Sequence, residues 1–170
     1  MKIMLPCGRF CFLRVQLTVF GNKNVVEGLH SGPAFRDNHY VFLDYDKKDL
    51  SLIDSEFGDI VTKMGWRRGI IMESSPGKYW ALAFSPTPIE KVLEVHKGSS
   101  EDENHKRHVL FKGYSVIRVD SKSNVLDKDG AVFKPRIVKV IENKGGDQFY
   151  NWQLEDWFVQ HWCREIEVKR

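Results

Sequence analysis

The segment His39–Asp46, with the sequence HYVFLDYD, constrains the fold of this chain more than any other. Aromatic and apolar residues dominate it, which is typical of a strand buried in a sheet. Apolar residues then recur at helical spacing across residues 50–64, and Gly65 follows as the expected helix stop. A buried strand followed at once by an amphipathic helix predicts a protein in which helices pack against a sheet.

The same patterns predict elements along the rest of the chain. Further strands are expected at 12–20, 69–73, 78–85, 114–119 and 136–141. Helices are expected after Thr87, at 105–112 and at 151–165, and a loop at 21–38. The sequence Thr87-Pro88-Ile89-Glu90 fits a capping box with proline at the first helical position, and Asn151 is a suitable cap for the last helix. We therefore expect an α+β fold, with a single domain over residues 1–170 built around a mixed or mostly antiparallel sheet flanked by helices.

Composition narrows the class of protein without indicating a partner. Hydrophobic residues make up 42% and charged residues 29% of the 170 residues, which is typical of a globular protein. The net charge of +3 is too small to indicate nucleic acid. No apolar run approaches the roughly 20 residues that span a bilayer, and proline, glycine and arginine interrupt the apolar N-terminal stretch, so neither a membrane span nor an export signal is expected. Three cysteines without a C-x-x-C pair are typical of reduced thiols, so we expect an intracellular, cytoplasmic protein.

Two carboxylates stand at the end of the expected strand 39–46. Asp44 and Asp46 are two residues apart, so in a strand they point to the same face, with α-carbons about 6.6 Å apart. Carboxylates this close repel each other unless a cation or water compensates them, and both can bind one hard divalent cation. The expected partner is therefore a metal ion, a lysine or arginine, or water. Their place on an apolar strand distinguishes them from the acid-x-acid triplet at 127–129, which is most simply a turn.

The segment 73–80, ESSPGKYW, combines a tight turn with hydroxyl groups and a lysine. Pro76 and Gly77 suit the second and third positions of a type II turn, which predicts a hairpin. Backbone N–H groups, Ser75 and Lys78 around such a turn can also bind phosphate. The spacing of a Walker loop is absent, and a plain hairpin is the simpler interpretation of this segment taken alone.

The expected strand 114–119 leads into a third polar group. Arg118 and Asp120 alternate with Ile117 and Val119, so they share one face of the strand. Two interpretations stay open: a structural ion pair, or a phosphate clamp beside a third metal ligand.

In this order, the three segments resemble the catalytic domain of the archaeo-eukaryotic primase superfamily, in particular the primase-polymerase-like replication proteins of archaeal plasmids and viruses. The strand of that family that ends in Asp-x-Asp is matched by Asp44 and Asp46, and its Ser-Pro-Gly-Lys-Tyr turn by residues 75–79. A later strand with an apolar-Arg-apolar motif is matched by residues 117–120. The resemblance extends over residues 39–141 and implies an RRM-like catalytic core.

The resemblance also implies template-directed nucleotidyl transfer, of the DNA primase or polymerase type, in plasmid or viral DNA replication. Two divalent ions, Mg²⁺ or Mn²⁺, would then be held by Asp44, Asp46 and Asp120. The nucleotide phosphates would be contacted by Ser75, Lys78, Arg118 and Lys122. The implied partners are a single-stranded or primed DNA template, nucleoside triphosphates and replication proteins such as a helicase.

Two positions depart from the family pattern. Trp80 stands where the family has a nucleotide-binding histidine, and its indole N–H donates a hydrogen bond but does not replace an imidazole. A core tryptophan is the simpler expectation at that position. Relatives often have serine where Asp120 stands.

Two other classes of function compete with the nucleotidyltransferase. A non-catalytic nucleic-acid-binding protein on the same fold is suggested by basic and aromatic residues at 63–68 and 105–108, which otherwise read as solvated helix ends. A structural or interaction protein is suggested by three tryptophans in the last helix, a stripe that more often belongs to a core: Trp152, Trp157 and Trp162.

Overall fold

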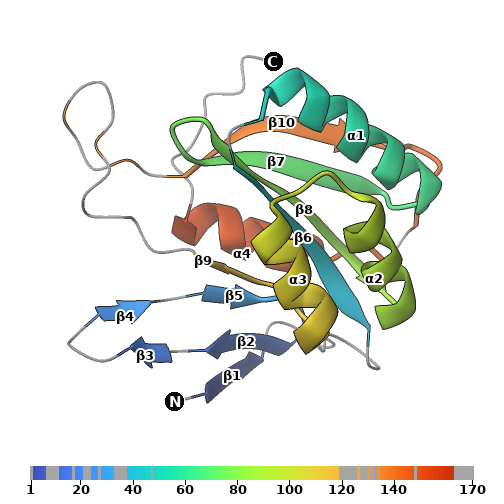
Figure 1. Cartoon of the computed structure of the whole chain (residues 1–170). Helices are drawn as coiled ribbons and strands as arrows, with labels where there is room; N and C mark the ends of the chain where they lie inside the picture. The colour runs from blue at the N-terminus through green and yellow to red at the C-terminus, as the bar shows by residue number, and fades with distance from the viewer. Residues whose placement is uncertain are drawn as a thin grey trace.

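The computed structural model describes residues 2–6, 12–16, 18–20, 24–26, 28–32, 38–46, 48–118, 126, 130, 133, 135–147 and 149–162. In chain order, its strands are β1 (Lys2–Pro6), β2 (Phe12–Gln16), β3 (Thr18–Phe20), β4 (Asn24–Val26), β5 (Gly28–His30), β6 (His39–Asp46), β7 (Arg68–Ser75), β8 (Lys78–Thr87), β9 (Val116–Arg118) and β10 (Arg136–Glu142). The helices are α1 (Leu50–Lys63), α2 (Ile89–Gly98), α3 (Glu103–Lys112) and α4 (Trp152–Trp162). These elements confirm the α+β fold class predicted from the sequence (Figure 1).

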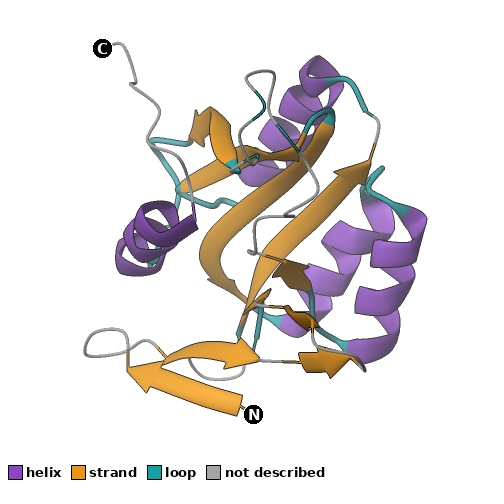
Figure 2. Cartoon of the chain, turned by 90° about the vertical axis from the view of Figure 1, so that its left-hand side faces the viewer, coloured by secondary structure: helices purple, strands orange, loops and turns teal. Residues whose placement is uncertain are grey.

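A four-stranded antiparallel sheet with the order β10-β7-β8-β6 forms the centre of the fold. Because β6 and β7 both pair antiparallel with β8, they run parallel to each other, and α1 connects them. This is a split βαβ unit, in which a third strand lies between the two parallel ones. A second sheet, β1-β2-β5-β9, and the hairpin of β3 and β4 lie together beneath the central sheet in the view of Figure 1 and again in Figure 2.

Side-chain alternation gives the central sheet two apolar faces. On one face, Val41 and Leu43 of β6 pack with Phe57 of α1 and with residues of α2. On the other face, Phe42 packs with Phe158 of α4 and with residues of β7 and β8. Helices α1 and α2 therefore cover one face of the sheet and α4 covers the opposite face (Figure 1).

Hydrogen bonds hold the second sheet against β6. Ser31 N donates to Ser115 O at 2.9 Å, and Tyr40 N donates to Ser31 O at 2.7 Å. Ser115 Oγ also donates to Phe42 O at 3.3 Å. The beginning of β9 is thereby placed beside the middle of β6.

Two local predictions are confirmed by the geometry. Gly77 has φ +72°, the left-handed conformation that the third position of a type II turn requires, and the hairpin of β7 and β8 forms around it. Asn151 caps α4, because its Oδ1 accepts a hydrogen bond from Leu154 N at 3.0 Å.

Two local predictions are wrong. The expected loop at 21–38 contains β4 and β5, whose three residues each are too few for alternation to be visible in the sequence. Thr87 does not cap α2 but ends β8, where its hydroxyl donates to Ser85 O at 2.9 Å and accepts from Trp66 Nε1 at 3.0 Å. Pro88 is the N-cap residue and contributes no side-chain cap bond.

Candidate functional site

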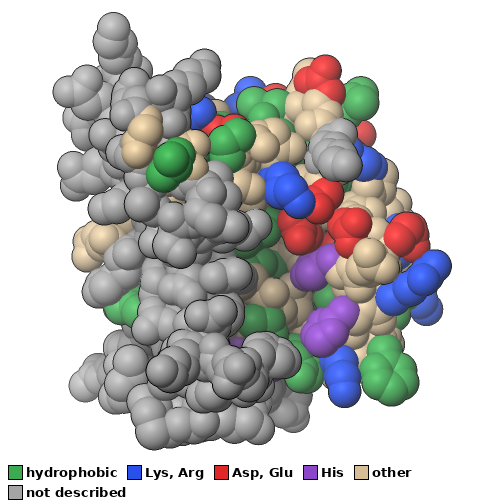
Figure 3. Space-filling view, turned by 60° about the vertical axis from the view of Figure 1, so that its left-hand side comes forward, with side chains coloured by type: hydrophobic (Ala, Val, Ile, Leu, Met, Phe, Trp, Pro, Cys, Tyr) green, Lys and Arg blue, Asp and Glu red, His purple; other side chains and the backbone are tan. Residues whose placement is uncertain are grey.

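Asp44 and Asp46 line one pocket, with a volume of about 210 Å³, at the end of β6. The β6–β8 register sets Asp44 opposite Trp80 and Asp46 opposite Lys78, so these four residues share one face of the sheet. The complete lining is Asp44, Asp46, Ser74, Lys78, Trp80, His105, Val116 and Ile117. Figure 3 shows acidic, basic and histidine side chains gathered on one face of the molecule. Four of the residues singled out from the sequence are thus brought together.

Lysine is the partner of the carboxylate pair in this structure. Lys78 Nζ lies 2.5 Å from Asp46 Oδ2, and both side chains are about one third exposed. The hydrogen bond to Asp46 raises the pKa of Lys78, although partial burial acts against it. Of the three partners that the sequence left open, the structure therefore shows a lysine at Asp46.

The Asp44 carboxyl is in a different electrostatic environment from that of Asp46. Burial is the main cause that raises its pKa above the usual value, and positive charge on His105 is the main opposing influence. The carboxylates of Asp46 and Asp102 raise the pKa further. A cation between these carboxylates would offset both the burial and the repulsion, so the site favours binding of positive charge.

The turn between β7 and β8 contributes less to the pocket than the sequence suggested. Ser75 is buried and does not line the pocket, whereas Ser74, on the opposite face of the strand, does. Ser74 Oγ donates to Lys78 O at 3.3 Å. Glu73 accepts from Gly77 N at 3.2 Å and pairs with Arg136 of β10, which holds the turn in place.

Trp80 belongs both to the core and to the pocket wall. It is buried among the residues that pack with α4, and one part of the side chain lines the pocket. The core position expected from the sequence is therefore confirmed, and the same indole also closes one side of the site.

Some predicted site residues lie outside the part of the chain that the structure describes. Asp120 and Lys122 are both in that category. Arg118 ends β9, but only its backbone is described. The third acidic ligand and two of the phosphate contacts consequently stay predictions.

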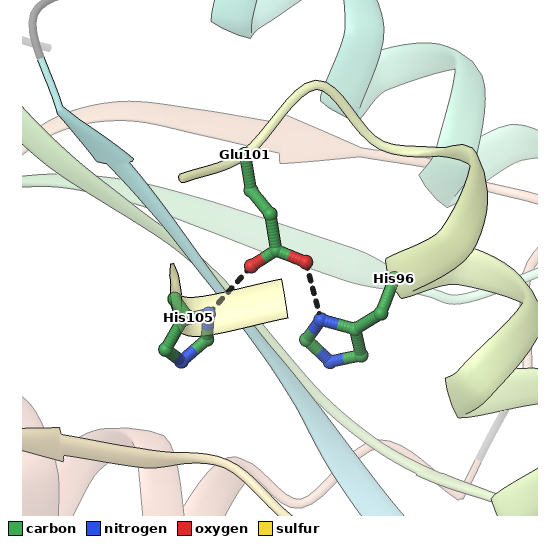
Figure 4. Close-up of side chains that lie close together, drawn as sticks. All are labelled: His96, Glu101 and His105. Atoms are coloured by element: carbon green, nitrogen blue, oxygen red, sulfur yellow. Dashed lines mark hydrogen bonds and ion pairs between the residues drawn. The ribbon is translucent and has the colours of Figure 1, made fainter. Parts of the chain in front are cut away.

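A buried cluster that was not predicted from the sequence adjoins the pocket. Glu101 lies between two imidazole rings, with Oε1 2.5 Å from His96 Nδ1 and Oε2 2.5 Å from His105 Nδ1 (Figure 4). Ser99 Oγ donates to Oε1 at 3.1 Å, and Asp44 N lies 3.4 Å from Oε2. Burial alone would raise the pKa of Glu101, but the hydrogen bonds and charges of His105 and His96 lower it to about 2. The sequence offered little signal for this cluster, because Glu101 precedes the N-cap Asp102 of α3 and helical spacing therefore does not place it beside His105.

This cluster also contains the ligand types that a transition metal prefers. One donor atom from each of His96, Glu101 and His105 lies within 4.8 Å of the others. Two imidazoles and a carboxylate occur together at zinc sites. The cluster is not evidence for the Mg²⁺ or Mn²⁺ expected from the sequence, since Mg²⁺ prefers oxygen ligands and two of the three donors are nitrogens.

The segment 63–68 and the buried aromatic residues of α4 have mainly structural roles. Trp66 is buried and bonded to Thr87, so the segment 63–68 offers no aromatic ring for stacking on a base. Arg68 of that segment pairs with Glu142 and Glu155. On α4, Phe158 and Leu154 supply the buried stripe, while Trp152 is 45% exposed.

Comparisons of this chain with protein-family models, with curated protein sequences and with solved structures find no match. Among the described residues, no helix has both the length and the apolar character needed to cross a membrane.

Proposed function

We propose that this protein catalyses template-directed nucleotidyl transfer, of the DNA primase or polymerase type, in the pocket at the end of β6. The observation that carries the proposal is the convergence of Asp44 and Asp46 with Lys78 and Trp80 around one pocket of about 210 Å³. Two carboxylates from one strand face, a cation and an aromatic wall match the needs of a metal-bound nucleoside triphosphate. The resemblance of three ordered motifs, which include Asp44, Asp46 and Lys78, to the primase superfamily adds support from the sequence.

The oxygens of Asp44 and Asp46 suit Mg²⁺ or Mn²⁺, because hard cations prefer carboxylate oxygens to nitrogen or sulfur. The burial that raises the pKa of Asp44 is a further indication of fit, since such a carboxylate gains most from a cation. Bound there, the ions would stabilise negative charge on the triphosphate and make the attacking 3′-hydroxyl group more acidic. Asp120 is proposed as a third ligand.

The protein side chains would orient the nucleotide around these ions. Lys78, released from Asp46 when a divalent cation takes its place, would neutralise phosphate oxygens. Trp80, Val116 and Ile117 form an apolar wall that suits the base and sugar. Arg118 and Lys122 belong to the proposal as further phosphate contacts, whereas Ser75, which is buried outside the pocket lining, does not.

The proposed substrates are nucleoside triphosphates and a single-stranded or primed DNA template, with a helicase as a replication partner. We place the reaction inside the cell, in the replication of a plasmid or a virus, because its substrates are intracellular.

The test combines metal binding with primer extension. Wild-type protein is titrated with MnCl₂ by calorimetry and assayed on primed and unprimed DNA templates, alongside the variants Asp44→Asn and Asp46→Asn. The matched control is Asp59→Asn, an exposed aspartate of α1 outside the pocket lining. We expect Mn²⁺ binding and extension in the wild type and the control, and loss of both in the two pocket variants. A wild-type protein that neither binds Mn²⁺ nor extends a primer contradicts the proposal.

A second function is favoured by one observation on α3. Phe111 is 82% exposed, and Lys112 Nζ lies 5.1 Å from the centre of its ring. An exposed aromatic ring beside a cation is typical of surfaces on which bases of a single strand stack. If the Asp44→Asn and Asp46→Asn proteins and the wild type all lack extension but bind single-stranded DNA, and Phe111→Ala weakens that binding, a non-catalytic binding protein is the better description.

A further inference from the structure

The outer face of α3 presents a continuous row of exposed side chains. Positions 104, 107, 108 and 111 follow one another at spacings of three, one and three residues, which places them on one face of the helix. All four side chains are exposed, whereas Val109, on another side of the helix, is fully buried. This row, with the neighbouring lysine, is called the α3 stripe below: Asn104, Arg107, His108, Phe111 and Lys112.

The α3 stripe carries positive charge that the fold does not neutralise. Arg107 and Lys112 are exposed, and neither forms an ion pair with another described residue. Glu103 is the single acidic residue of α3, and it pairs with Lys106 at 3.1 Å. Two free cations on one helix face attract a polyanion rather than a neutral or basic partner.

Aromatic rings accompany these cations. Phe111 is 82% exposed, and Lys112 Nζ lies 5.1 Å from the centre of its ring. His108 presents a second ring, which is held edge-on to Tyr114 with 5.8 Å between the ring centres. Rings of this kind bind unpaired bases by stacking while neighbouring cations contact the phosphates. Bases of a duplex already stack on each other, so the α3 stripe suits a single strand.

The α3 stripe begins beside the pocket and leads away from it. His105 of α3 lines the pocket, and so do Val116 and Ile117, which follow the helix in the chain. From His105 to Phe111 the helix rises about 9 Å, a distance that about three nucleotides of a stacked strand would cover. On the face shown in Figure 3, histidine side chains lie between the acidic group and further basic and hydrophobic side chains.

We propose that the α3 stripe binds the unpaired template strand ahead of the primer end. Phe111 stacks on a base about three nucleotides from the pocket, and Arg107 and Lys112 contact phosphates. The inference rests on the proposed function, because it takes the pocket as the place where the nucleotide is added. Template behind the primer end is paired and offers no free base to Phe111, which is why the unpaired strand is the ligand.

The first measurement is the affinity for a fluorescein-labelled single-stranded oligodeoxynucleotide, followed by anisotropy over a range of salt concentrations. Phe111→Ala should weaken binding by about five- to a hundredfold, the range for one stacked base. Arg107→Gln and Lys112→Gln should each reduce the slope of log affinity against log salt by about 0.7. The matched controls are Leu52→Ala, which is 65% exposed on α1, and Lys91→Gln, which is exposed on α2. Both controls should bind as the wild type does.

The second measurement locates the α3 stripe relative to the pocket. Primer extension is measured on templates with about two or about ten unpaired nucleotides ahead of the primer end. On the short overhang, which does not reach Phe111, Phe111→Ala should extend as the wild type does. On the long overhang, the variant should have a KM for the template at least about fivefold higher and an unchanged kcat, because Phe111 holds the strand without touching the reacting atoms. A damaged fold would instead lower extension equally on both templates.

The outcomes separate this inference from the proposed function. If the wild type extends primers but Phe111→Ala has the wild-type KM on both templates, the α3 stripe is not the template path and the proposed function stands. If the three stripe variants all bind single-stranded DNA as the wild type does, the inference is likewise overturned, and the exposed ring is left to a protein partner. A wild type that extends no primer removes the proposed function and the template role together.

Discussion

Lys78 Nζ lies 2.5 Å from Asp46 Oδ2, directly across the ladder between β8 and β6. The lysine thus holds the position that a cation would take beside the carboxylate pair. Because Lys78 directly follows the turn at Gly77, the hairpin that connects β7 and β8 also places a positive charge beside Asp46. The conformation of this turn therefore determines where the positive charge of Lys78 lies in the pocket.

Replacement of Lys78 should change the affinities for two ligands in opposite directions. Lys78→Met should tighten the binding of Mn²⁺ alone by about two- to fivefold, the range expected when a partly exposed ion pair no longer competes. The same variant should bind dATP in the presence of Mn²⁺ more weakly, because a phosphate contact is lost. Calorimetric titrations of both ligands check the prediction, with the exposed Lys97→Met of α2 as the control. Unchanged or weaker binding of Mn²⁺ alone would show that Lys78 does not compete for the metal position.

Low pH should destabilise the protein through Glu101. Its folded pKa of about 2 lies below its ordinary value of 4.5, so its contribution to stability is complete above pH 4.5 and declines as the pH falls towards about 2. This difference in pKa corresponds to a stabilisation on the order of 3 kcal/mol. Urea unfolding between pH 6 and pH 2 measures it. The Glu101→Gln variant should have a lower free energy of unfolding than the wild type at pH 6, and this free energy should fall less steeply on acidification. An equally steep fall in the two proteins would contradict the stabilising role of the Glu101 carboxylate.

The face of the sheet covered by α4 should depend strongly on one phenylalanine. Phe158 is fully buried, and its ring centre lies 5.8 Å from that of Phe84. Phe158→Ala is expected to lower the free energy of unfolding by about 3 to 5 kcal/mol. Phe149→Ala, at a position that is 80% exposed, should change it by less than about 0.5 kcal/mol. Similar losses in the two variants would mean that α4 does not pack on the sheet as described.

Alanine substitution at two glycines should change the stability of the protein in opposite directions. Gly77 has φ +72°, so an alanine side chain there is strained, and Gly77→Ala should cost about 1 kcal/mol or more. Gly58 lies within α1, and an added Cβ would meet nothing within 4 Å, so Gly58→Ala should stabilise the protein by about 0.5 to 1 kcal/mol. Urea denaturation of both variants measures whether the free energy of unfolding falls for Gly77→Ala and rises for Gly58→Ala. A neutral Gly77→Ala would argue against the left-handed turn.

Local patterns in the sequence were sufficient for several elements of the central sheet and the helix that packs on it. The apolar run of β6, the helical spacing of α1 and the Pro76-Gly77 turn all appear in the structure where they were expected. Residues two apart in a strand must share a face, so Asp44 and Asp46 were predictable as a pair. The hairpin register then brings Lys78 and Trp80 to the same face.

Contacts between distant segments could not be predicted in this way. Thr87 has the residue type of a helix cap, yet its hydroxyl is taken by Trp66, which is 21 residues away. The strand β5 is identified only by its partners β2 and β9, because a three-residue strand has little pattern of its own.

The sequence by itself determined which strand carries the two carboxylates and which turn faces them, because alternation and turn chemistry act over a few neighbouring residues. The tertiary structure alone decided that Glu101 and His105 adjoin this pair, since their positions depend on how the loop after α2 and the helix α3 pack against β6. It also decided that Ser115, 73 residues beyond Phe42, bonds to β6 and orients the ring of His105. Such contacts arise from packing of segments far apart in the chain, which no local pattern encodes.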